Sequence, residues 1–406
     1  MRSIVQYNRK DAIVNNLGTF FLWILLGLMT IAPQRIPIIA EIPMSSTILF
    51  VTFFIVTINK FKYLKEEEKK YFLLLIFSLF FLFISRTING YSIDEVFTSL
   101  MRGFALVSMF FFGFRGKFWI KWRAFSLVLY ILVVVNFITI LLYPNGMSSN
   151  ELYSLNWFLG YKNGMVRTMM PALTFSVIDS MHNHGKIVIK DFILYGICIA
   201  SVILGDSSTS LVMLVIFMPC VLIFTKKRPI NKLNIITLYL VVGIISVSIV
   251  VFGVQTYFAD FLGDYLDRDV TFTGRTYAWE YTLIRIMDSP IIGFGYHDGE
   301  EWRDVLGFFG ENGNNAVGFS HPHNYILYMI LQGGFIYLAL YSLIIWYINK
   351  KFNTENQCVS FNILVIMYFC FFVEGITESV TGAVLFYPML ALFPLLQNEG
   401  KILYKR

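Results

Sequence analysis

The sequence predicts an all-α polytopic membrane protein with about 12 transmembrane helices and one large extracytoplasmic loop containing short helices. Hydrophobic residues make up 57% of the 406 residues and charged residues only 14%, whereas soluble domains carry roughly 25% charged residues. The apolar residues also gather in long runs, and a helix needs about 20 apolar residues to cross the hydrocarbon core. These observations argue against a soluble globular enzyme.

Twelve apolar runs follow one another along the chain, and the short ones require tilt or neighbouring helices to fit a bilayer. They are residues 12–33, 36–58, 71–87, 96–114, 119–143, 165–181, 189–204, 208–225, 233–254, 323–349, 358–378 and 380–397. The first run is too long for a signal-peptide core and lacks a small-residue cleavage site, so we expect a retained helix. We therefore divide the chain into residues 1–254 with helices 1–9, residues 255–322 as the large external loop, and residues 323–406 with helices 10–12.

The basic residues predict the orientation of these helices. Of the 32 Lys and Arg residues, 23 lie near the two termini or in segments 59–70, 115–123, 182–190, 226–232 and 350–357. All of these segments face the same side if the N-terminus is cytoplasmic, and basic residues favour the cytoplasmic side. Both termini should then be cytoplasmic and the long loop outside the cytoplasm. The net charge of +6 is therefore a sign of topology and not of nucleic-acid binding.

Two segments between apolar runs carry recognisable patterns. From Pro144 to Lys162, apolar and aromatic residues recur at a spacing that predicts a short interfacial helix, although an aromatic anchor at the membrane surface is the simpler alternative. In the long loop, Phe258, Phe261 and Leu262 begin one apolar helix face. Thr273 is a suitable cap for a second helix, which runs to about Ser289 and is ended by Pro290, Gly293 and Gly295.

Polar residues at the outer ends of apolar runs are costly in a membrane and therefore informative. Arg102, Arg167, the hairpin Asp206–Thr209, Glu374 and Glu378 all fall in the predicted outer leaflet. Together they suggest a polar cavity that opens to the outer face, although Glu374 could instead pair simply with Arg102. The four cysteines lie in or beside apolar runs, and this placement does not suggest a structural disulfide.

The long polar stretch from Tyr257 to His323 is the best place for chemistry, because three of the five histidines lie in it. An outer cavity with arginines, in a chain without nucleotide-binding motifs, points to an anionic lipid substrate. Arg275 suits binding of a diphosphate, and His323 suits removal of a proton from an acceptor hydroxyl. The alternatives are a surface arginine, a helix-capping histidine, a zinc site at His321 and His323, and a Trp279 that is part of the core rather than a platform for sugars.

The combination of motifs is similar to that of the O-antigen ligase and polysaccharide polymerase superfamily of bacterial membrane glycosyltransferases. The resemblance covers about residues 255–345 and also includes a Lys162-Asn163 element before a membrane helix. The residues that carry it in the long loop and after it are Gly274-Arg275, Trp279, Pro290, Gly293, Gly295, His323-Asn324, Leu327 and Gly333-Gly334.

The resemblance implies an undecaprenyl-diphosphate-linked oligosaccharide as the donor, with no cofactor and no metal. It implies that Arg275 binds the donor diphosphate, that His323 activates the acceptor hydroxyl or positions the reacting groups, and that Asn324 orients His323 or holds the loop. The expected partners are membrane lipids and a chain-length regulator protein, without nucleic acid. The further substrate-binding candidates are Arg167, Arg102, Lys162, Asn163, Trp279, Asn324, Ser207, Ser208 and Glu374.

One departure from the family pattern favours a polymerase, which transfers a growing lipid-linked glycan chain onto a lipid-linked repeat unit. Ligases of this family often carry a Ser-Arg pair at the outer hairpin, whereas residues 206–210 contain no arginine. Arg167 or Arg102 would then supply the second cation at the diphosphate. The alternative is an O-antigen ligase that transfers the finished glycan to a lipid core or another acceptor. A flippase or transporter would also use an outer cavity, but it would not need a large one-sided loop.

Overall fold

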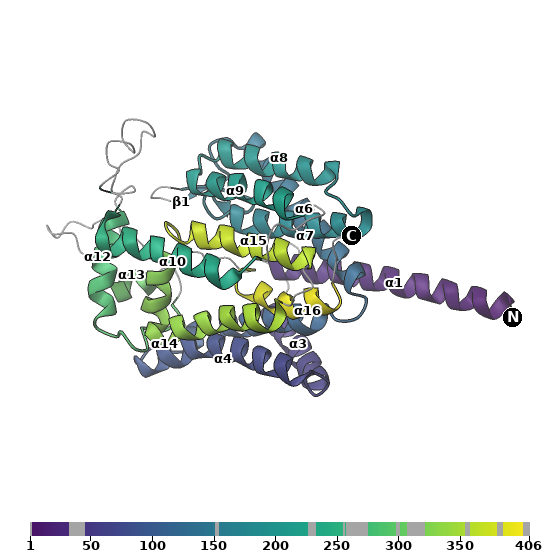
Figure 1. The fold of residues 1–406 in the computed structure, drawn as a ribbon, viewed down its shortest axis with the longest axis horizontal. Coiled ribbons are helices and arrows are strands. Elements are labelled where there is room, and N and C mark those ends of the chain that lie inside the picture. Colours follow the sequence, from purple (N-terminus) through teal and green to yellow (C-terminus); the bar gives the residue numbers. More distant parts are fainter. Residues whose placement is uncertain are drawn as a thin grey trace.

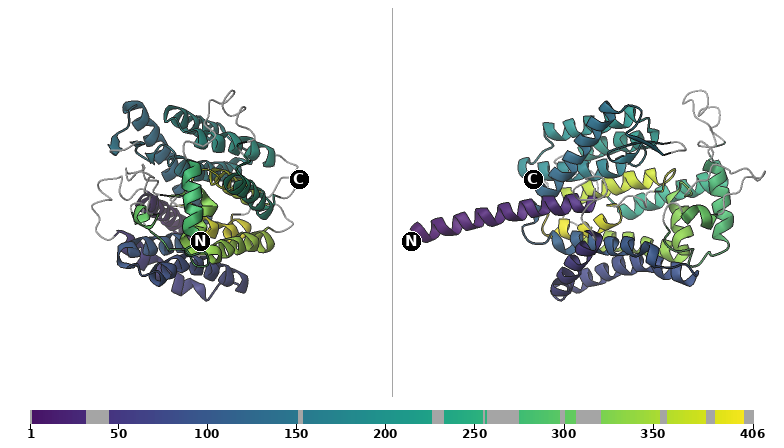
Figure 2. Two further views of the ribbon diagram at one scale, coloured as in Figure 1. Left: turned by 90° about the vertical axis from the view of Figure 1, so that its left-hand side faces the viewer. Right: turned by 180° about the vertical axis from the view of Figure 1, so that it is seen from behind.

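The computed structural model is a bundle of helices that lie roughly along one long axis (Figure 1; Figure 2). The residues it describes are 2–31, 45–150, 154–225, 233–254, 256, 275–297, 301–306, 321–353, 358–379 and 385–400. The predicted amphipathic helix at Phe258–Leu266, the proposed cap Thr273 and most of residues 298–320 lie outside these ranges.

Helices account for most of the described chain. The longer ones are α1 (Arg2–Ile31), α3 (Ser45–Phe61), α4 (Glu66–Ile88), α5 (Phe97–Ser108), α6 (Phe118–Leu142), α7 (Val166–His184), α8 (Ile189–Leu204), α9 (Ser208–Phe224), α10 (Ile235–Phe252), α12 (Arg275–Ile286), α14 (Tyr325–Tyr347) and α15 (Val359–Glu374). The shorter ones are η1 (Asp94–Val96), η2 (Met109–Gly113), α13 (Glu301–Leu306), η4 (Ile348–Phe352), η6 (Pro388–Leu392) and α16 (Phe393–Asn398). The prediction of an all-α membrane fold is therefore confirmed at this level.

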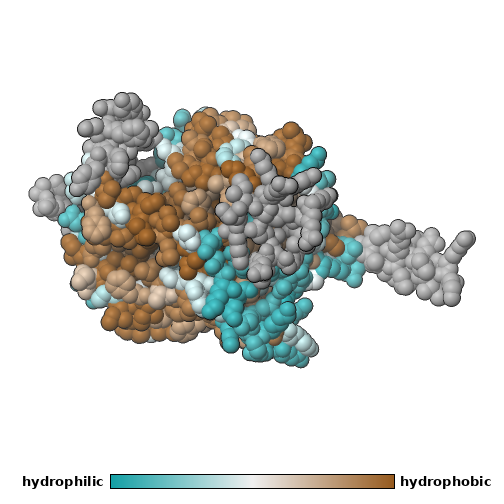
Figure 3. Space-filling view, viewed as in Figure 1, coloured by the Kyte–Doolittle hydropathy of each residue, from teal (hydrophilic) through white to brown (hydrophobic). Residues whose placement is uncertain are grey.

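Among the residues that the structure describes, five helical segments are long and apolar enough to cross a membrane. They are Glu66–Ile88, Asp94–Gly113, Phe118–Leu142, Ile235–Phe252 and Tyr325–Phe352. Four shorter apolar helices, of 10 to 17 residues, accompany them in the described ranges, and the total of about 12 spans stays a prediction. Figure 3 shows one face of the molecule, where apolar surface gathers on the left and upper part of the bundle and hydrophilic surface at the lower right.

The prediction of one helix for the last apolar run, residues 380–397, is wrong for residues 385–397, which the structure describes. Residues 385–400 instead form a turn, the short helix η6 and the short helix α16. Pro388 and Pro394 each lie at the start of one of these helices. A proline lacks the backbone donor that a continuous helix needs, so the segment is broken into short pieces. These pieces are buried in the main core, where Leu390 and Phe393 are fully inaccessible.

A second prediction is also wrong, because the segment after α6 forms a small sheet and not an interfacial helix. Strands β1 (Ser148–Asn150), β2 (Ser154–Trp157) and β3 (Gly160–Tyr161) pair in that order, and both pairs are antiparallel. Trp157 is buried and donates its ring N–H to the Tyr143 carbonyl, at 2.8 Å. The aromatic residue therefore packs inward, towards the protein.

The basic segments 59–70, 115–123 and 350–353 meet at one end of the bundle, which we call the basic end. Glu67 on α4 accepts hydrogen bonds from Tyr347 at 2.6 Å and from Lys351 at 3.0 Å. Glu68 pairs with Arg115 at 3.1 Å, in the turn between η2 and α6. Helices α12 and α13 lie at the opposite end (Figure 1; Figure 2), which we call the loop end.

We expect the basic end to face the cytoplasm, because basic residues are favoured on that side. Single cysteines placed at Lys62 and Met147, both exposed, would report the two ends in intact cells. An impermeant thiol reagent should label Met147→Cys and leave Lys62→Cys unlabelled until the membrane is opened. The wild-type chain corrects for the four native cysteines, which are free thiols and are buried or half-buried. The reverse labelling pattern would overturn the proposed orientation.

The segment Pro290–Gly295 lies between α4 and α14, and its backbone contacts the backbones of both helices. Helix α14 is interrupted at Gly333 and Gly334, where Gly334 has φ of +62°. Phe294 and Gly295 donate their backbone N–H groups to the carbonyls of Leu331 and Gln332, at 2.9 and 2.6 Å. A Cβ atom on Gly334 would lie 2.1 Å from the Ile291 backbone, and one on Gly295 would lie 2.3 Å from that of Arg86. The glycines of this motif are therefore required for close approach of two backbones.

Arg86 ties the loop helix α13 to the membrane helices. Its side chain is 1% exposed and binds both carboxylate oxygens of Glu301, at 2.8 and 2.9 Å. It also pairs with Glu95 at 2.7 Å and donates to the Tyr296 carbonyl at 2.9 Å. A buried arginine needs such a set of acceptors to offset the loss of water. This contact fixes one end of the long loop over the bundle.

Candidate functional site

Five segments far apart in the sequence meet at the loop end of the bundle and form one polar cluster. It contains Arg275 at the start of α12, His323 before α14, Asn163 before α7, Arg167 in the first turn of α7, Ser207 before α9, and Glu374 and Glu378 at the end of α15 and just after it. Four of these segments are helix N-termini, where the aligned peptide dipoles favour an anion.

Glu378 is the centre of this cluster. One of its carboxylate oxygens accepts from Arg275 Nη2 at 2.7 Å and from Asn163 Nδ2 at 2.8 Å. The other oxygen faces His323 Nδ1 at 3.3 Å. Burial alone raises the pKa of Glu378, but the hydrogen bond with His323 and the charge of Arg275 outweigh it and lower this pKa to about 2. Glu378 is therefore an anion at every physiological pH.

Arg275 is oriented by two partners in this arrangement. Nη2 binds Glu378, while Nη1 donates to the carbonyl oxygen of Thr377. Its side chain is 17% exposed, so Arg275 is not fully closed off from the surface. A guanidinium has five N–H donors in a fixed plane, and the remaining donors are suited to the oxygens of a phosphate group.

His323 adopts a backbone conformation that is uncommon for a residue with a side chain. Its φ is +49°, and such residues gather at functional sites because the surrounding structure must impose the conformation. The next residue, Asn324, caps α14 by accepting from the Leu327 N–H at 3.0 Å. Its amide also donates to Ser246 at 2.8 Å and to the Ile376 carbonyl at 2.9 Å. Asn324 therefore fixes the start of α14 directly after His323, and its role towards His323 stays a prediction.

Arg167 and Glu374 form a second ion pair beside the first. Arg167 Nε lies 3.5 Å from a Glu374 oxygen, and Glu374 is 1% exposed. The simple pairing of Glu374 with Arg102 is therefore wrong. Arg102 instead donates to the Thr30 carbonyl on α1, at 2.8 Å, and the structure does not bring it to the cluster.

The Lys-Asn element and the outer hairpin also join the cluster. Ser207 donates to Asn163 at 2.7 Å, and the Asn163 amide in turn holds Glu378. Lys162 lies 3.4 Å from Asp206, which has φ of +51° at the turn between α8 and α9. Ser208 begins α9 and is exposed. The hairpin therefore supports Glu378 through Asn163, and Lys162 lies at its margin.

Trp279 does not offer a platform for sugars. It is 1% exposed and packs in a second apolar cluster with Trp302, Tyr328 and Leu331. A sugar can stack on an indole only where a face of the ring is open, so a substrate-binding role for Trp279 is wrong in this arrangement. Its position on α12, one turn after Arg275, instead anchors that helix to α14.

Three side chains of the cluster could share a metal ion. The ligand atoms of His321, His323 and Glu378 all lie within 4.8 Å of one another. Burial and the neighbouring charges of His323, Arg167 and Arg275 lower the pKa of His321 to about 3, so His321 is neutral at physiological pH. A metal would, however, lie beside two arginines and share Glu378 with Arg275. The positive charges of the two arginines would repel a metal cation beside them. The three side chains therefore fit a metal ion poorly.

Comparison with known proteins covers one part of this cluster. Residues 193–342, which include Arg275, His323 and Asn324, match the O-antigen ligase family. The resemblance to the O-antigen ligase and polysaccharide polymerase superfamily is thereby confirmed. Together with the apolar helices, this match indicates a multi-pass membrane protein.

Curated relatives of this O-antigen ligase-like chain are distant. A provisionally named polysaccharide ligase of Rickettsia typhi is 26% identical over 209 residues, which are 50% of this chain and 49% of the relative. An uncharacterised protein of Haemophilus influenzae is 27% identical over 61% of this chain and 65% of its own length. A provisionally named polysaccharide ligase of Rickettsia conorii is 28% identical over 26% of each chain. The chain thus spans less than two thirds of each relative, and no solved structure matches it.

Proposed function

We propose that the protein is a glycosyltransferase that moves a glycan from a lipid diphosphate to an acceptor hydroxyl at the outer face of the bacterial cytoplasmic membrane. One observation carries this proposal. Glu378 joins Arg275, a group suited to a diphosphate, to His323, a group suited to a proton, in one buried cluster. The match of residues 193–342 to the O-antigen ligase family supports the same chemistry.

The arginines would bind and stabilise the leaving group. As the bond between the anomeric carbon and the diphosphate oxygen breaks, negative charge develops on the diphosphate. Arg275 is already oriented by Thr377 and Glu378, and a preorganised donor of this kind stabilises charge without further reorganisation. Arg167, 3.5 Å from Glu374, would supply the second positive charge.

His323 would accept the proton of the acceptor hydroxyl. With Nδ1 donating to Glu378, the other ring nitrogen carries the lone pair. The acceptor oxygen attacks the anomeric carbon while its proton passes to His323, and the lipid diphosphate leaves on the opposite face. A single displacement of this kind inverts the configuration at the anomeric carbon. Glu378 keeps the imidazole in the required tautomer and stabilises its charged form.

We now favour the ligase over the polymerase. The preference for a polymerase rested on the missing arginine in hairpin 206–210. That absence no longer discriminates, because Arg167 lies beside Glu374 in the same cluster and can replace the missing cation. The family description and the names of two relatives also concern ligases.

Deletion of the gene tests this function and separates the two candidates. Loss of a ligase should leave long lipid-linked glycans that accumulate without attachment, whereas loss of a polymerase should leave glycans of a single repeat unit. Electrophoresis of the surface glycan and of the extracted lipid-linked precursors distinguishes these outcomes. Surface glycan unchanged in length and amount in the deletion strain would refute both.

We expect turnover without a divalent metal, since the positive charge of Arg275 and Arg167 takes the place of a metal ion at the diphosphate. Purified protein treated with a strong chelator should keep its full transfer rate. The matched sample receives the chelator together with excess zinc, which controls for the reagent itself. Activity that is lost with chelator and restored by zinc would instead assign His321 and His323 as ligands.

A further inference from the structure

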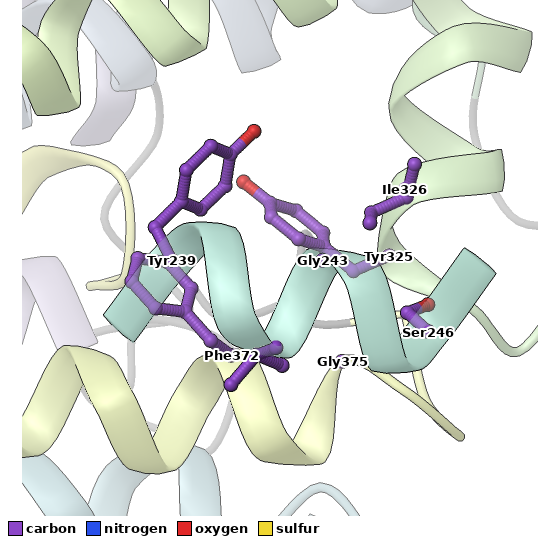
Figure 4. A pocket seen from close by; sticks show the side chains of 8 residues that line it. Tyr239, Gly243, Ser246, Tyr325, Ile326, Phe372 and Gly375 are labelled. Atoms are coloured by element: carbon purple, nitrogen blue, oxygen red, sulfur yellow. The ribbon is translucent and has the colours of Figure 1, made fainter. Parts of the chain in front are cut away.

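Sites for small molecules combine a few polar groups with apolar and aromatic side chains, and the polar cluster supplies the polar groups. The cavity between α10, α14 and α15 does not supply the aromatic surface. It is walled by side chains such as Tyr239, Tyr325 and Phe372 (Figure 4), and its volume of about 10 Å³ has room for roughly one water molecule. A sugar ring next to the cluster must therefore pack against an exposed side chain.

The small sheet places an exposed aromatic ring beside the cluster. Tyr161 on β3 is 38% exposed. It lies two residues before Asn163, whose amide donates to Glu378 at 2.8 Å. Burial and the charge of Glu378 raise the pKa of Tyr161, while the charge of Arg275 lowers it. Both charged residues are therefore close enough to act on the Tyr161 hydroxyl.

The Tyr161 ring stands on a rigid support. The turn that joins β2 to β3 is fixed to α6, because Leu159 donates its backbone N–H to Asn136 Oδ1 at 2.6 Å. The carbonyl of Tyr161 accepts from the N–H groups of Gly164 and Met165, just before α7, at 2.8 and 3.2 Å. The backbone of Tyr161 is thus held from both sides. A side chain that is already positioned in this way loses little freedom when a ligand binds.

We propose that the Tyr161 ring is a stacking platform for a sugar ring of the glycan, an inference that rests on the proposed function. One face of a pyranose ring carries several C–H groups, and these apolar groups pack well against the flat face of an aromatic ring. The phenol oxygen at the edge of the ring can exchange hydrogen bonds with sugar hydroxyls.

Two sugars come within reach of this platform. The sugar with the reacting anomeric carbon is bonded directly to the diphosphate, which Arg275 would bind. The sugar with the acceptor hydroxyl must lie next to it during transfer. A ring beside Arg275 and Glu378 could stack on either, and the two cases differ in which substrate loses affinity when the ring is removed.

Tyrosines at the outer surface also serve as anchors among the lipid headgroups, and Tyr143 offers a comparison. Tyr143 is 49% exposed at the end of α6. It accepts from the Trp157 ring N–H through its backbone carbonyl, which a substitution of the side chain keeps. Tyr143→Leu is therefore the matched control, because it removes an exposed tyrosine and leaves the residues of the cluster unchanged.

Binding of two probes to the purified protein tests the platform. The first probe is the repeat-unit oligosaccharide released from the lipid-linked donor of the same strain, and the second is inorganic pyrophosphate. Tyr161→Leu should raise the Kd for the oligosaccharide by about tenfold, as expected for loss of one aromatic contact, and leave the Kd for pyrophosphate unchanged. Tyr161→Phe should restore oligosaccharide binding, because it keeps the ring. Tyr143→Leu should bind both probes as wild type does.

Four results would overturn the platform. Unchanged oligosaccharide binding by Tyr161→Leu would make Tyr161 a surface anchor. Equal losses for the two probes would show that it only supports the cluster. A tenfold loss in Tyr161→Phe would assign the effect to the hydroxyl and not to the ring. Absence of oligosaccharide binding to the wild-type protein would leave no sugar to stack.

Transfer assays identify the sugar and separate this inference from the proposed function. A rise of about tenfold in the KM of Tyr161→Leu for the lipid-linked donor would assign the platform to the donor glycan, and the same rise for the acceptor would assign it to the acceptor. An unchanged KM for both substrates would overturn the platform. If the wild-type protein binds the oligosaccharide through Tyr161 but transfers no glycan, the platform stands and the proposed function fails.

Discussion

Arg275→Ala should lower the rate of glycan transfer by about 100- to 1000-fold, the usual cost of removing one preorganised electrostatic donor. The reason is that the leaving diphosphate gains negative charge in the transition state, and no other described side chain occupies the position of Arg275 beside Glu378. Arg275→Lys should restore little activity, because lysine keeps the charge but loses the planar fork. Transfer from a purified lipid-linked donor, normalised to the amount of membrane-inserted protein, measures both variants.

Arg275→Ala removes an ion pair as well as a donor, so its control variant must also remove an ion pair, at a place away from the cluster. Arg123→Ala serves, because Arg123 pairs with Asp179 at the basic end, at 3.5 Å, far from the cluster. Its transfer rate should stay within about twofold of wild type, as expected for a partly exposed pair that contributes little to stability. Wild-type transfer by correctly inserted Arg275→Ala would remove Arg275 from the site.

His323→Ala should lower transfer by about 100- to 10,000-fold, the usual contribution of a positioned general base. His321→Ala is the matched control. The His321 ring lies 4.1 Å from the His323 ring, but in the proposed mechanism it is His323 that is paired with Glu378. We expect the control to keep most of its activity. Equal losses in the two variants would contradict a specific role for His323.

Glu378→Gln tests whether the carboxylate acts through His323 and Arg275. We expect a large loss of transfer in this variant, and no further loss when it is combined with His323→Ala, because residues that act as a unit are strongly non-additive. Multiplicative losses in the double variant would show that Glu378 acts independently of His323. The amount of inserted protein must be measured for each variant, since Glu378 is 2% exposed and its partners are buried with it.

The helices were the most predictable part of the fold, because long apolar runs carry their own signal. Residues 71–87, 119–143 and 233–254 each correspond to one helix with small differences at the ends. The sheet at residues 148–161 was missed, since three very short strands have no periodicity that differs from that of a helical turn. The proline breaks in residues 385–400 were also passed over in favour of the apolar composition.

Within the candidate site, sequence reasoning found the residues that stand in a motif and missed those that complete it by folding. Arg275, His323 and Asn163 were predicted from short patterns, and the structure brings them together at Glu378. Glu378 was noted only as a polar residue at the end of an apolar run. It lies 103 positions after Arg275, and no local pattern marks it as the partner. Arg86 was missed as an anchor for the same reason.

The close backbone contact around Gly293, Gly295 and Gly334 has a consequence for mutational screens of this protein. No side chain fits at these positions, so every replacement there should reduce the amount of folded protein, whatever substrate is assayed. Variants of the polar cluster should instead be abundant and inactive. A screen that scores abundance and transfer separately would therefore sort motif residues into those that build the scaffold and those that act on the glycan.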